Sequence, residues 1–246
     1  MQVPAIKSSA KKSAKALLQR LGYDPVPFDK STISDRVLSR ALALAGPINT
    51  VIDVGASNGS WSLDVVERLP GAHFLLFEAA PFHAPALRAI TQPRFSVEYA
   101  AASDHTGEVK FYLDPSNPNG GGASATATDE HHATVPCNTI DSAVASRGLP
   151  GPYLIKLDAQ GHEREILAGA ASTMANASLL WIETYGVDQP GRPPFDEICT
   201  ELRALGFRAA GIADVLTRPS DGMLWQMDIF FVRSTHPAFE NTFFWD

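Results

Sequence analysis

The chain has 246 residues, of which 45% are hydrophobic and 19% are charged, as is typical of a globular protein with one sizeable core. Its formal net charge is −7, which repels a phosphate backbone and argues against nucleic acid as a partner. No uninterrupted apolar stretch is long enough to cross a bilayer, so we expect no integral membrane segment.

The amino-terminal part of the chain predicts a helical extension over residues 1–47. A leucine-rich helical run ends at Gly22, and a second run that begins at Ser34 ends at Gly46-Pro47, where a helix must stop. We expect the second helix to pack against a sheet that is formed by the remaining domain, residues 48–246.

Short apolar runs alternate with helical patterns through most of that domain. Such alternation predicts parallel strands joined by crossover helices, and therefore a doubly wound α/β fold. The final third predicts a helix followed by a closing pair of strands. The expected strands are residues 50–54, 74–77, 95–100, 153–157, 179–183, 207–212 and 227–232.

Residues 115–136 have a different composition, rich in Gly, Ser, Thr, Asn and Ala, and they show no apolar period. This composition predicts a loop. We expect it to act as a mobile lid over the substrate.

A glycine-containing turn follows the first expected strand directly. Residues 55–59 read Gly-Ala-Ser-Asn-Gly, and a helical stretch begins soon after them. Gly55 and Gly59 permit positive φ angles and leave bare backbone against which a ligand can lie. Glu78 ends the second expected strand, about twenty residues later, where an acid accepts hydrogen bonds from ribose hydroxyls. The two signals together predict a nucleoside site.

The spacing of the two glycines bears on which nucleoside binds. It differs from the Gly-x-Gly-x-x-Gly pattern of dinucleotide sites, so S-adenosylmethionine suits the turn better than a pyrophosphate does. Two other interpretations stay open: a nucleoside-binding module without catalysis, and a nicotinamide-dependent oxidoreductase.

Three segments carry a resemblance to a known family. Residues 53–62 (DVGASNGSWS) are similar to the first motif of the FkbM family of class I methyltransferases. Residues 101–104, with Gly107, Val109 and Phe111, resemble the segment that follows a strand in that family. Residues 155–163 (IKLDAQGHE) resemble its most characteristic signature. Ser57 stands where the family usually has Asn, and His162 stands where it usually has a small residue.

The resemblance implies a Rossmann-like class I methyltransferase fold with a mostly parallel seven-stranded sheet. It implies S-adenosylmethionine beside the glycine turn, the ribose on Glu78, and the adenine edge near Ser103 and Asp104. The implied cofactor-binding residues are Asp53, Gly55, Ala56, Ser57, Asn58, Gly59, Glu78, Ser103 and Asp104.

Candidate catalytic residues follow the fourth and fifth main strands. In an open parallel sheet the carboxyl ends of the strands line a crevice, so Asp158 is expected across from the glycine turn. Methyl transfer to a hydroxyl benefits from a base, and Asp158 or His162 is predicted to be that base. His162 has the better intrinsic pKa, and Glu183 is expected to orient the acceptor or the base. We predict O-methylation of a sugar, a glycan or a secondary metabolite.

Further residues concern metals, compartment and assembly. His131 and His132 are adjacent and point apart on an extended chain, so no metal site is expected there. Asp158 and Glu183 could supply oxygen ligands for Mg²⁺, and this alternative stays open. The two cysteines have neither disulfide nor metal spacing, which favours a reducing cytoplasm.

We expect four aromatic residues near the carboxyl end to pack on the domain or on a second copy of the chain, as in a homodimer. They are Phe239, Phe243, Phe244 and Trp245.

Overall fold

The computed structural model describes residues 33–113, 121–123, 132–189 and 191–243. The first predicted helix and most of the predicted 115–136 loop lie outside the described residues. The expected role of that loop as a lid therefore stays a prediction. Phe244 and Trp245 also lie outside the described residues.

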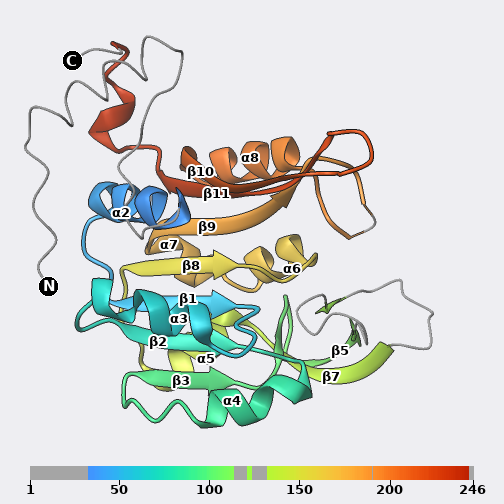
Figure 1. Ribbon diagram of the computed structural model, residues 1–246. Coiled ribbons are helices and arrows are strands. Elements are labelled where there is room, and N and C mark those ends of the chain that lie inside the picture. Colours follow the sequence, from blue (N-terminus) through green and yellow to red (C-terminus); the bar gives the residue numbers. More distant parts are fainter. Residues whose placement is uncertain (1–32, 114–120, 124–131, 190, 244–246) are drawn as a thin grey trace, which may run out of the picture. The chain divides into compact units, whose positions relative to one another are not determined.

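A seven-stranded sheet forms the centre of the described domain, with strand order β10-β11-β9-β8-β1-β2-β3 (Figure 1). Neighbouring strands are parallel from β9 to β3, and β11 runs antiparallel to both of its neighbours. The mostly parallel seven-stranded sheet is therefore confirmed. The strands are β1 (Thr50–Val54), β2 (His73–Phe77), β3 (Phe95–Glu98), β8 (Tyr153–Leu157), β9 (Ala177–Tyr185), β10 (Phe207–Thr217) and β11 (Leu224–Arg233).

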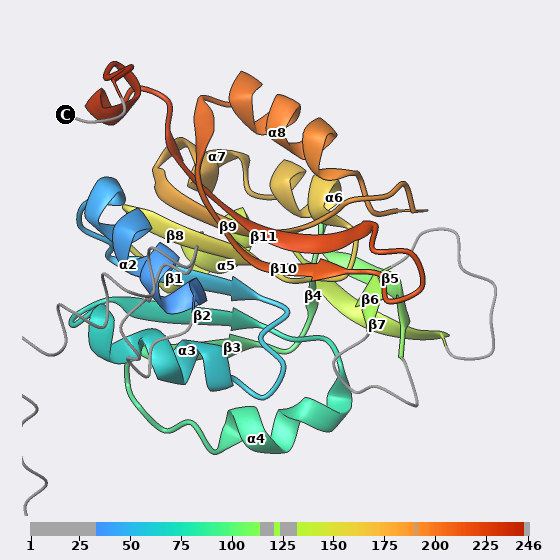
Figure 2. The same cartoon turned by 45° about the horizontal axis from the view of Figure 1, so that its top comes forward.

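Helices cover both faces of this sheet (Figure 2). Alternate strand residues point to opposite faces, so in β1 Val51 joins one apolar cluster and Ile52 joins the other. Burial on both faces explains the near-continuous apolar runs of the strands. One face carries α2 (Ile33–Ala45), α3 (Ser60–Val65) and α4 (Ala84–Arg88), and the other carries α5 (Ile140–Arg147), α6 (Glu163–Ala168), α7 (Ala171–Ala175) and α8 (Phe195–Ala204).

The predicted packing of helix α2 on the sheet is confirmed. Leu38 is buried in the same cluster as Phe230 of β11. A side chain at Gly211 of β10 would lie 2.5 Å from Val37, so this strand approaches the helix closely.

A second, four-stranded sheet was not predicted. Its order is β4-β7-β5-β6. The predicted loop over residues 115–136 is wrong for residues 122–123 and 132–136, which belong to strands of this sheet. In β7, Val135 and Cys137 are buried while Thr134 and Pro136 are exposed, so one face packs inward. The strands are β4 (Ala101–Ala102), β5 (Gly107–Tyr112), β6 (Gly122–Ala123) and β7 (His132–Asn138).

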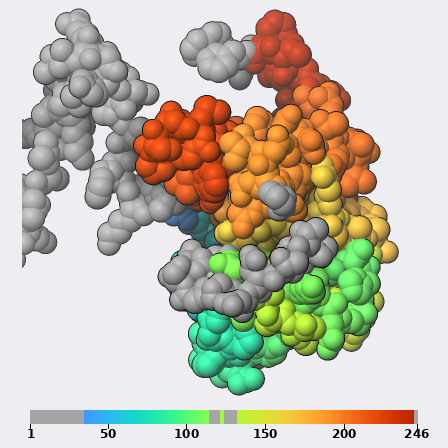
Figure 3. All heavy atoms as spheres, turned by 90° about the vertical axis from the view of Figure 1, so that its right-hand side faces the viewer, coloured from blue at the N-terminus to red at the C-terminus, as the bar shows by residue number. Residues whose placement is uncertain are grey.

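The strand order indicates at which edge of the sheet a ligand would bind. From β1 the chain proceeds outward to β2 and β3, whereas β8 lies on the other side of β1, so the order reverses between β1 and β8. Ligands bind at such switch points, beyond the carboxyl ends of the strands. Figure 3 looks onto that edge, with the carboxyl-terminal third in orange and red above the green and teal segments.

The carboxyl-terminal aromatic residues differ in their packing. Phe239 packs against the apolar cluster of the α2 face, and the Arg208 guanidinium lies 4.1 Å from its ring centroid. Phe243 is 74% exposed, so it does not pack on the domain, and its packing on a second copy of the chain stays a prediction. No helix in the described ranges is long and apolar enough to cross a membrane.

Candidate active site

The glycine turn after β1 is held by both neighbouring strands. The backbone N–H groups of Gly55 and Ala56 donate to the carbonyl of Phe77 in β2. Gly55 has φ 78°, and a Cβ there would lie 2.0 Å from the backbone oxygen of Asp158. Only glycine allows this close approach, which fixes the ends of β1 and β8 relative to each other.

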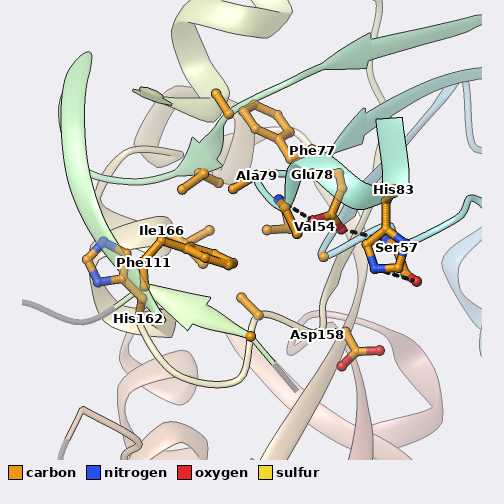
Figure 4. Close-up of a pocket in the computed structure, with 18 residues that line it drawn as sticks. Val54, Ser57, Phe77, Glu78, Ala79, His83, Phe111, Asp158, His162 and Ile166 are labelled. Carbon is orange, nitrogen blue, oxygen red and sulfur yellow. Dashed lines mark hydrogen bonds between the residues drawn. The ribbon is translucent and has the colours of Figure 1, made fainter. Parts of the chain in front are cut away.

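Glu78 anchors the middle of the same turn. Its Oε2 accepts a hydrogen bond from the Ser57 N–H at 2.6 Å, and its Oε1 accepts one from the Ala80 N–H at 2.7 Å. Burial raises the pKa of the Glu78 carboxyl, and these two hydrogen bonds oppose the rise. Ser57 has φ 50°, unusual for a serine, and its Oγ lies 3.3 Å from His83 Nε2 (Figure 4).

Two hollows meet at Gly55, Ser57 and Asp158. The small hollow, of about 60 Å³, extends toward β2 and has mostly apolar walls, including Phe77. Phe111 of the second sheet also contributes to it. It is lined by Val54, Gly55, Ser57, Phe77, Glu78, Ala79, Ala80, His83, Ala100, Ala101, Ala102, Phe111, Gly121, Ala123, Asp158, Ala159, His162 and Ile166.

The large hollow, of about 390 Å³, extends toward β9 and is more polar. Its charged side chains come from β8, from the residue after β8, and from β9. It is lined by Gly55, Ala56, Ser57, Asn58, Ser60, Trp61, Lys156, Asp158, Gln160 and Glu183.

Lys156 is the buried cation at the base of the large hollow. Its Nζ lies 2.9 Å from Asp158 Oδ2 and 3.4 Å from Asp53 Oδ1, and its side chain is 6% exposed. Burial lowers the pKa of the Lys156 ammonium, but the charges of Asp158 and Asp53 outweigh it and raise the pKa. The ammonium therefore stays charged and joins the two carboxylates.

Glu183 lies beside Asp158 on the same rim. Its Oε2 accepts the Tyr185 hydroxyl at 2.7 Å, and its Oε1 accepts Gln226 Nε2 at 2.6 Å. Burial raises the pKa of the Glu183 carboxyl, and the negative charge of Asp158 raises it further. Asp228 pairs with Glu183 across β9 and β11, and burial raises its pKa to about 7.

His162 lies apart from this rim. Its Nε2 is 3.0 Å from Ser103 Oγ and its Nδ1 is 3.5 Å from Glu165 Oε2. Burial lowers the pKa of the imidazole. In Figure 4 the Asp158 carboxylate points away from His162. The structure thus brings Asp158 and Glu183 together and sets His162 on the small hollow.

The turn between β8 and α6 is strained and is held by a buried acid. Gln160, Gly161 and His162 have φ angles of 57°, 115° and 74° in succession. Glu163 Oε1 accepts the Gly161 N–H at 2.9 Å, and Glu163 Oε2 has no hydrogen-bond partner among the described residues. Burial raises the pKa of Glu163 to about 7.

Of four further predicted cofactor residues, Asp53, Asn58, Ser103 and Asp104, Asn58 alone is in the lining of either hollow. Asp53 is fully buried and accepts the Ser62 hydroxyl at 2.7 Å. Ser103 Oγ contacts His162, and Asp104 Oδ1 lies 2.6 Å from His105 Nδ1. Asn58 lines the large hollow, and its Oδ1 accepts the Ser60 N–H. Their contacts with a cofactor stay predictions.

Sequence reasoning missed several residues of the site. His83 reaches the small hollow from a segment without a recognisable motif, and the motif that contains Phe111 gave no sign that this ring would line the hollow. Gln226 and Asp228 did leave a signal, because they alternate with apolar residues at the start of β11. A strand buried on both faces has no need of such polar positions.

Comparison with known proteins gives one family and two curated relatives. The family described as "Methyltransferase FkbM domain" matches residues 53–209. The 2-O-methyltransferase NoeI of Sinorhizobium fredii is 25% identical over 188 residues, which are 68% of this chain and 76% of NoeI. The hexuronic acid methyltransferase AglP of Haloferax volcanii is 30% identical over 87 residues, which are 35% of either chain.

A solved structure with a similar chain path is the 1,6-didemethyltoxoflavin-N1-methyltransferase of Burkholderia thailandensis. Its sequence is 14% identical, the TM-score is 0.44, and the match covers 95% of this chain and 93% of that chain.

Proposed function

Because the chain belongs to the FkbM family of S-adenosylmethionine-dependent methyltransferases, we propose that it methylates a hydroxyl of a sugar or glycan that binds in the large hollow. The family assignment makes the chain an enzyme, and it decides against the nicotinamide oxidoreductase and the non-catalytic module. The printed names of the two curated relatives, a 2-O-methyltransferase and a hexuronic acid methyltransferase, support oxygen and sugar as the acceptor chemistry.

The residues of the small hollow fit the cofactor. Each Glu78 oxygen accepts one backbone N–H and keeps acceptor capacity that suits the vicinal hydroxyls of a ribose. The apolar walls around Phe77 and Ile166 suit a flat base. When bound, S-adenosylmethionine supplies an electrophilic methyl group.

Asp158 carries the proposal, because it lines both hollows at their junction. Lys156 holds Asp158 Oδ2 at 2.9 Å, and this contact orients the carboxylate toward the rim. In our proposal Asp158 Oδ1 accepts a hydrogen bond from the acceptor hydroxyl. It takes the hydroxyl proton as the hydroxyl oxygen attacks the methyl group. Glu183 positions the acceptor from the neighbouring strand.

The direct test is incubation of the purified chain with labelled S-adenosylmethionine and a panel of methyl glycosides, followed by mass spectrometry of the sugars. We expect a methyl ether on one hydroxyl and equimolar S-adenosylhomocysteine. Binding of S-adenosylhomocysteine without transfer to any glycoside would reject a sugar acceptor and leave the family assignment intact.

A further inference from the structure

The large hollow has an unbalanced charge. Among the described residues that line it, Lys156 is the cation, whereas Asp158 and Glu183 are acids. Asp53 and Asp228 lie behind the lining, and the charges of both act on the Lys156 ammonium. Four carboxyl groups therefore surround one ammonium.

The Lys156 ammonium is already paired with two carboxylates of the protein. Lys156 Nζ already contacts Asp158 at 2.9 Å and Asp53 at 3.4 Å, and it lies 5.2 Å from the centroid of the Trp61 ring. If it turned toward a ligand, it would leave Asp53, which is fully buried, with an uncompensated charge. Such a buried unpaired charge is strongly unfavourable.

Arg192 is the next cation to consider, and it faces elsewhere. Its guanidinium lies 5.1 Å from the centroid of the Tyr185 ring, and it lines a different hollow, beside Arg164 and Glu197. Its charge is the smallest of the influences on the pKa of Glu183. It therefore offsets little of the negative charge at the rim.

The acids already repel one another. Burial raises the pKa of Glu183, and the charge of Asp158 raises it further; the pKa of Asp228 is raised to about 7 with a contribution from both of these neighbours. A further carboxylate or phosphate in the hollow would add to this repulsion. Hydroxyl groups, in contrast, donate hydrogen bonds to carboxylates, and the Trp61 ring offers an apolar wall for the carbon face of a sugar.

Building on the proposed function, we propose that the large hollow selects a neutral or amino sugar and rejects hexuronic acids and sugar phosphates. The charge of Asp158 and Glu183, with Lys156 already paired with Asp158 and Asp53, sets this selectivity. The acceptor class therefore differs from the hexuronic acid named for one of the curated relatives.

Matched pairs of acceptors test the proposal. Methyl glycosides of glucose, galactose and mannose are compared with the methyl glycosides of the corresponding uronic acids, which differ by a carboxylate at C6. At pH 8 we expect kcat/KM to favour the neutral member of an accepted pair by at least about tenfold, the ratio that corresponds to 1.4 kcal/mol. Equal values, or a preference for the uronide, would overturn the inference.

Two charge-removing variants connect the selectivity to these residues. Glu183→Gln removes the charge and keeps one oxygen that accepts from Gln226 or from Tyr185. Asp228→Asn removes the charge and keeps one oxygen that accepts from Trp181. Each should reduce the neutral-to-uronide ratio at least about threefold. Glu67→Gln removes an exposed acid outside both hollows and should leave the ratio unchanged. A ratio that stays constant in both hollow variants contradicts the electrostatic cause.

A binding measurement separates this inference from the proposed function. If no glycoside is methylated, calorimetric titration of both members of each pair into the complex with S-adenosylhomocysteine decides the matter. Binding of the neutral member alone would support the charge selectivity although the transfer proposal had failed. Tighter binding of the uronide, or binding of neither, would overturn it.

Discussion

Lys156 Nζ lies 2.9 Å from Asp158 Oδ2, at the point where the two hollows of the site meet. The two residues are on the same face at the end of β8, so the strand's period of two places the ammonium directly behind the carboxylate. Asp53 holds the ammonium from behind. This arrangement gives Asp158 one fixed oxygen and one that is available to a ligand.

Glu78→Gln should weaken binding of S-adenosylhomocysteine. The amide keeps one acceptor oxygen, but it turns an N–H₂ group toward the backbone N–H of Ser57 or Ala80. Loss of a charge-assisted hydrogen bond costs on the order of 1.5–3 kcal/mol, which is roughly ten- to hundredfold in affinity. Isothermal titration measures the effect, with Glu67→Gln as the control. Unchanged affinity would remove Glu78 from the cofactor site.

Gly55→Ala should disrupt the junction between β1 and β8. Its Cβ would lie 2.0 Å from the Asp158 oxygen, in addition to the strain of a positive φ. Gly46 is a matched control, because its φ is 76° and nothing lies within 4 Å of an added Cβ. Gly46→Ala should cost about 1–2 kcal/mol and Gly55→Ala clearly more, as urea unfolding would measure. Equal losses would mean that the close approach is unimportant.

The sequence predicted the central sheet well, for a physical reason. Strands buried on both faces must be apolar throughout, so residues 50–54 and 153–157 stand out as runs of strand length. The glycine turn was also visible, because Gly55 has a positive φ angle that residues with a side chain rarely adopt. The predicted strand 95–100 was too long: β3 ends at Glu98, and the chain then enters the second sheet.

The second sheet and several contacts of the site could not be predicted from local sequence patterns. The strands β4 and β6 have two residues each, too few to show a period. Contacts such as His83 with Ser57, or Ser103 with His162, join residues 26 and 59 positions apart, and nothing local in the sequence records them. The sequence left both Asp158 and His162 open as the base, because it could not show which way the imidazole ring points.

Glu163→Gln should make the protein more stable at pH 8 than the parent chain, with little difference near pH 4.5. The folded-state pKa of Glu163 is raised from 4.5 to about 7. Its protonated form therefore stabilises the fold at low pH, and this stability is lost as the pH rises from about 4.5 through 7. The amide carries no charge and keeps the acceptor for the Gly161 N–H. The gain at pH 8 should be roughly 1–3 kcal/mol by urea unfolding. A difference that does not vary with pH would contradict this prediction.

His162→Asn should affect stability and cofactor binding more than the chemical step. Asparagine tolerates the left-handed conformation that His162 adopts at φ 74°, but it loses the imidazole contact with Ser103. We expect kcat to change less than about threefold when the cofactor is saturating, and unfolding to occur at lower urea concentration. A fall in kcat of two orders of magnitude at unchanged KM would instead make His162 the base.

Asp158→Asn should slow methyl transfer without releasing the cofactor. The amide keeps the shape of the side chain, but it lacks the negative charge that pairs with Lys156 and most of the basicity needed to take a proton. If Asp158 accepts the hydroxyl proton, kcat should fall by about two to four orders of magnitude, the usual range for loss of a general base. The affinity for S-adenosylhomocysteine should change little, because Glu78 and the glycine turn make the expected contacts with it. Single-turnover rates and calorimetry separate the two effects. Loss of cofactor binding, with the rate per bound enzyme preserved, would assign Asp158 to the cofactor site and leave Glu183 as the carboxylate at the rim.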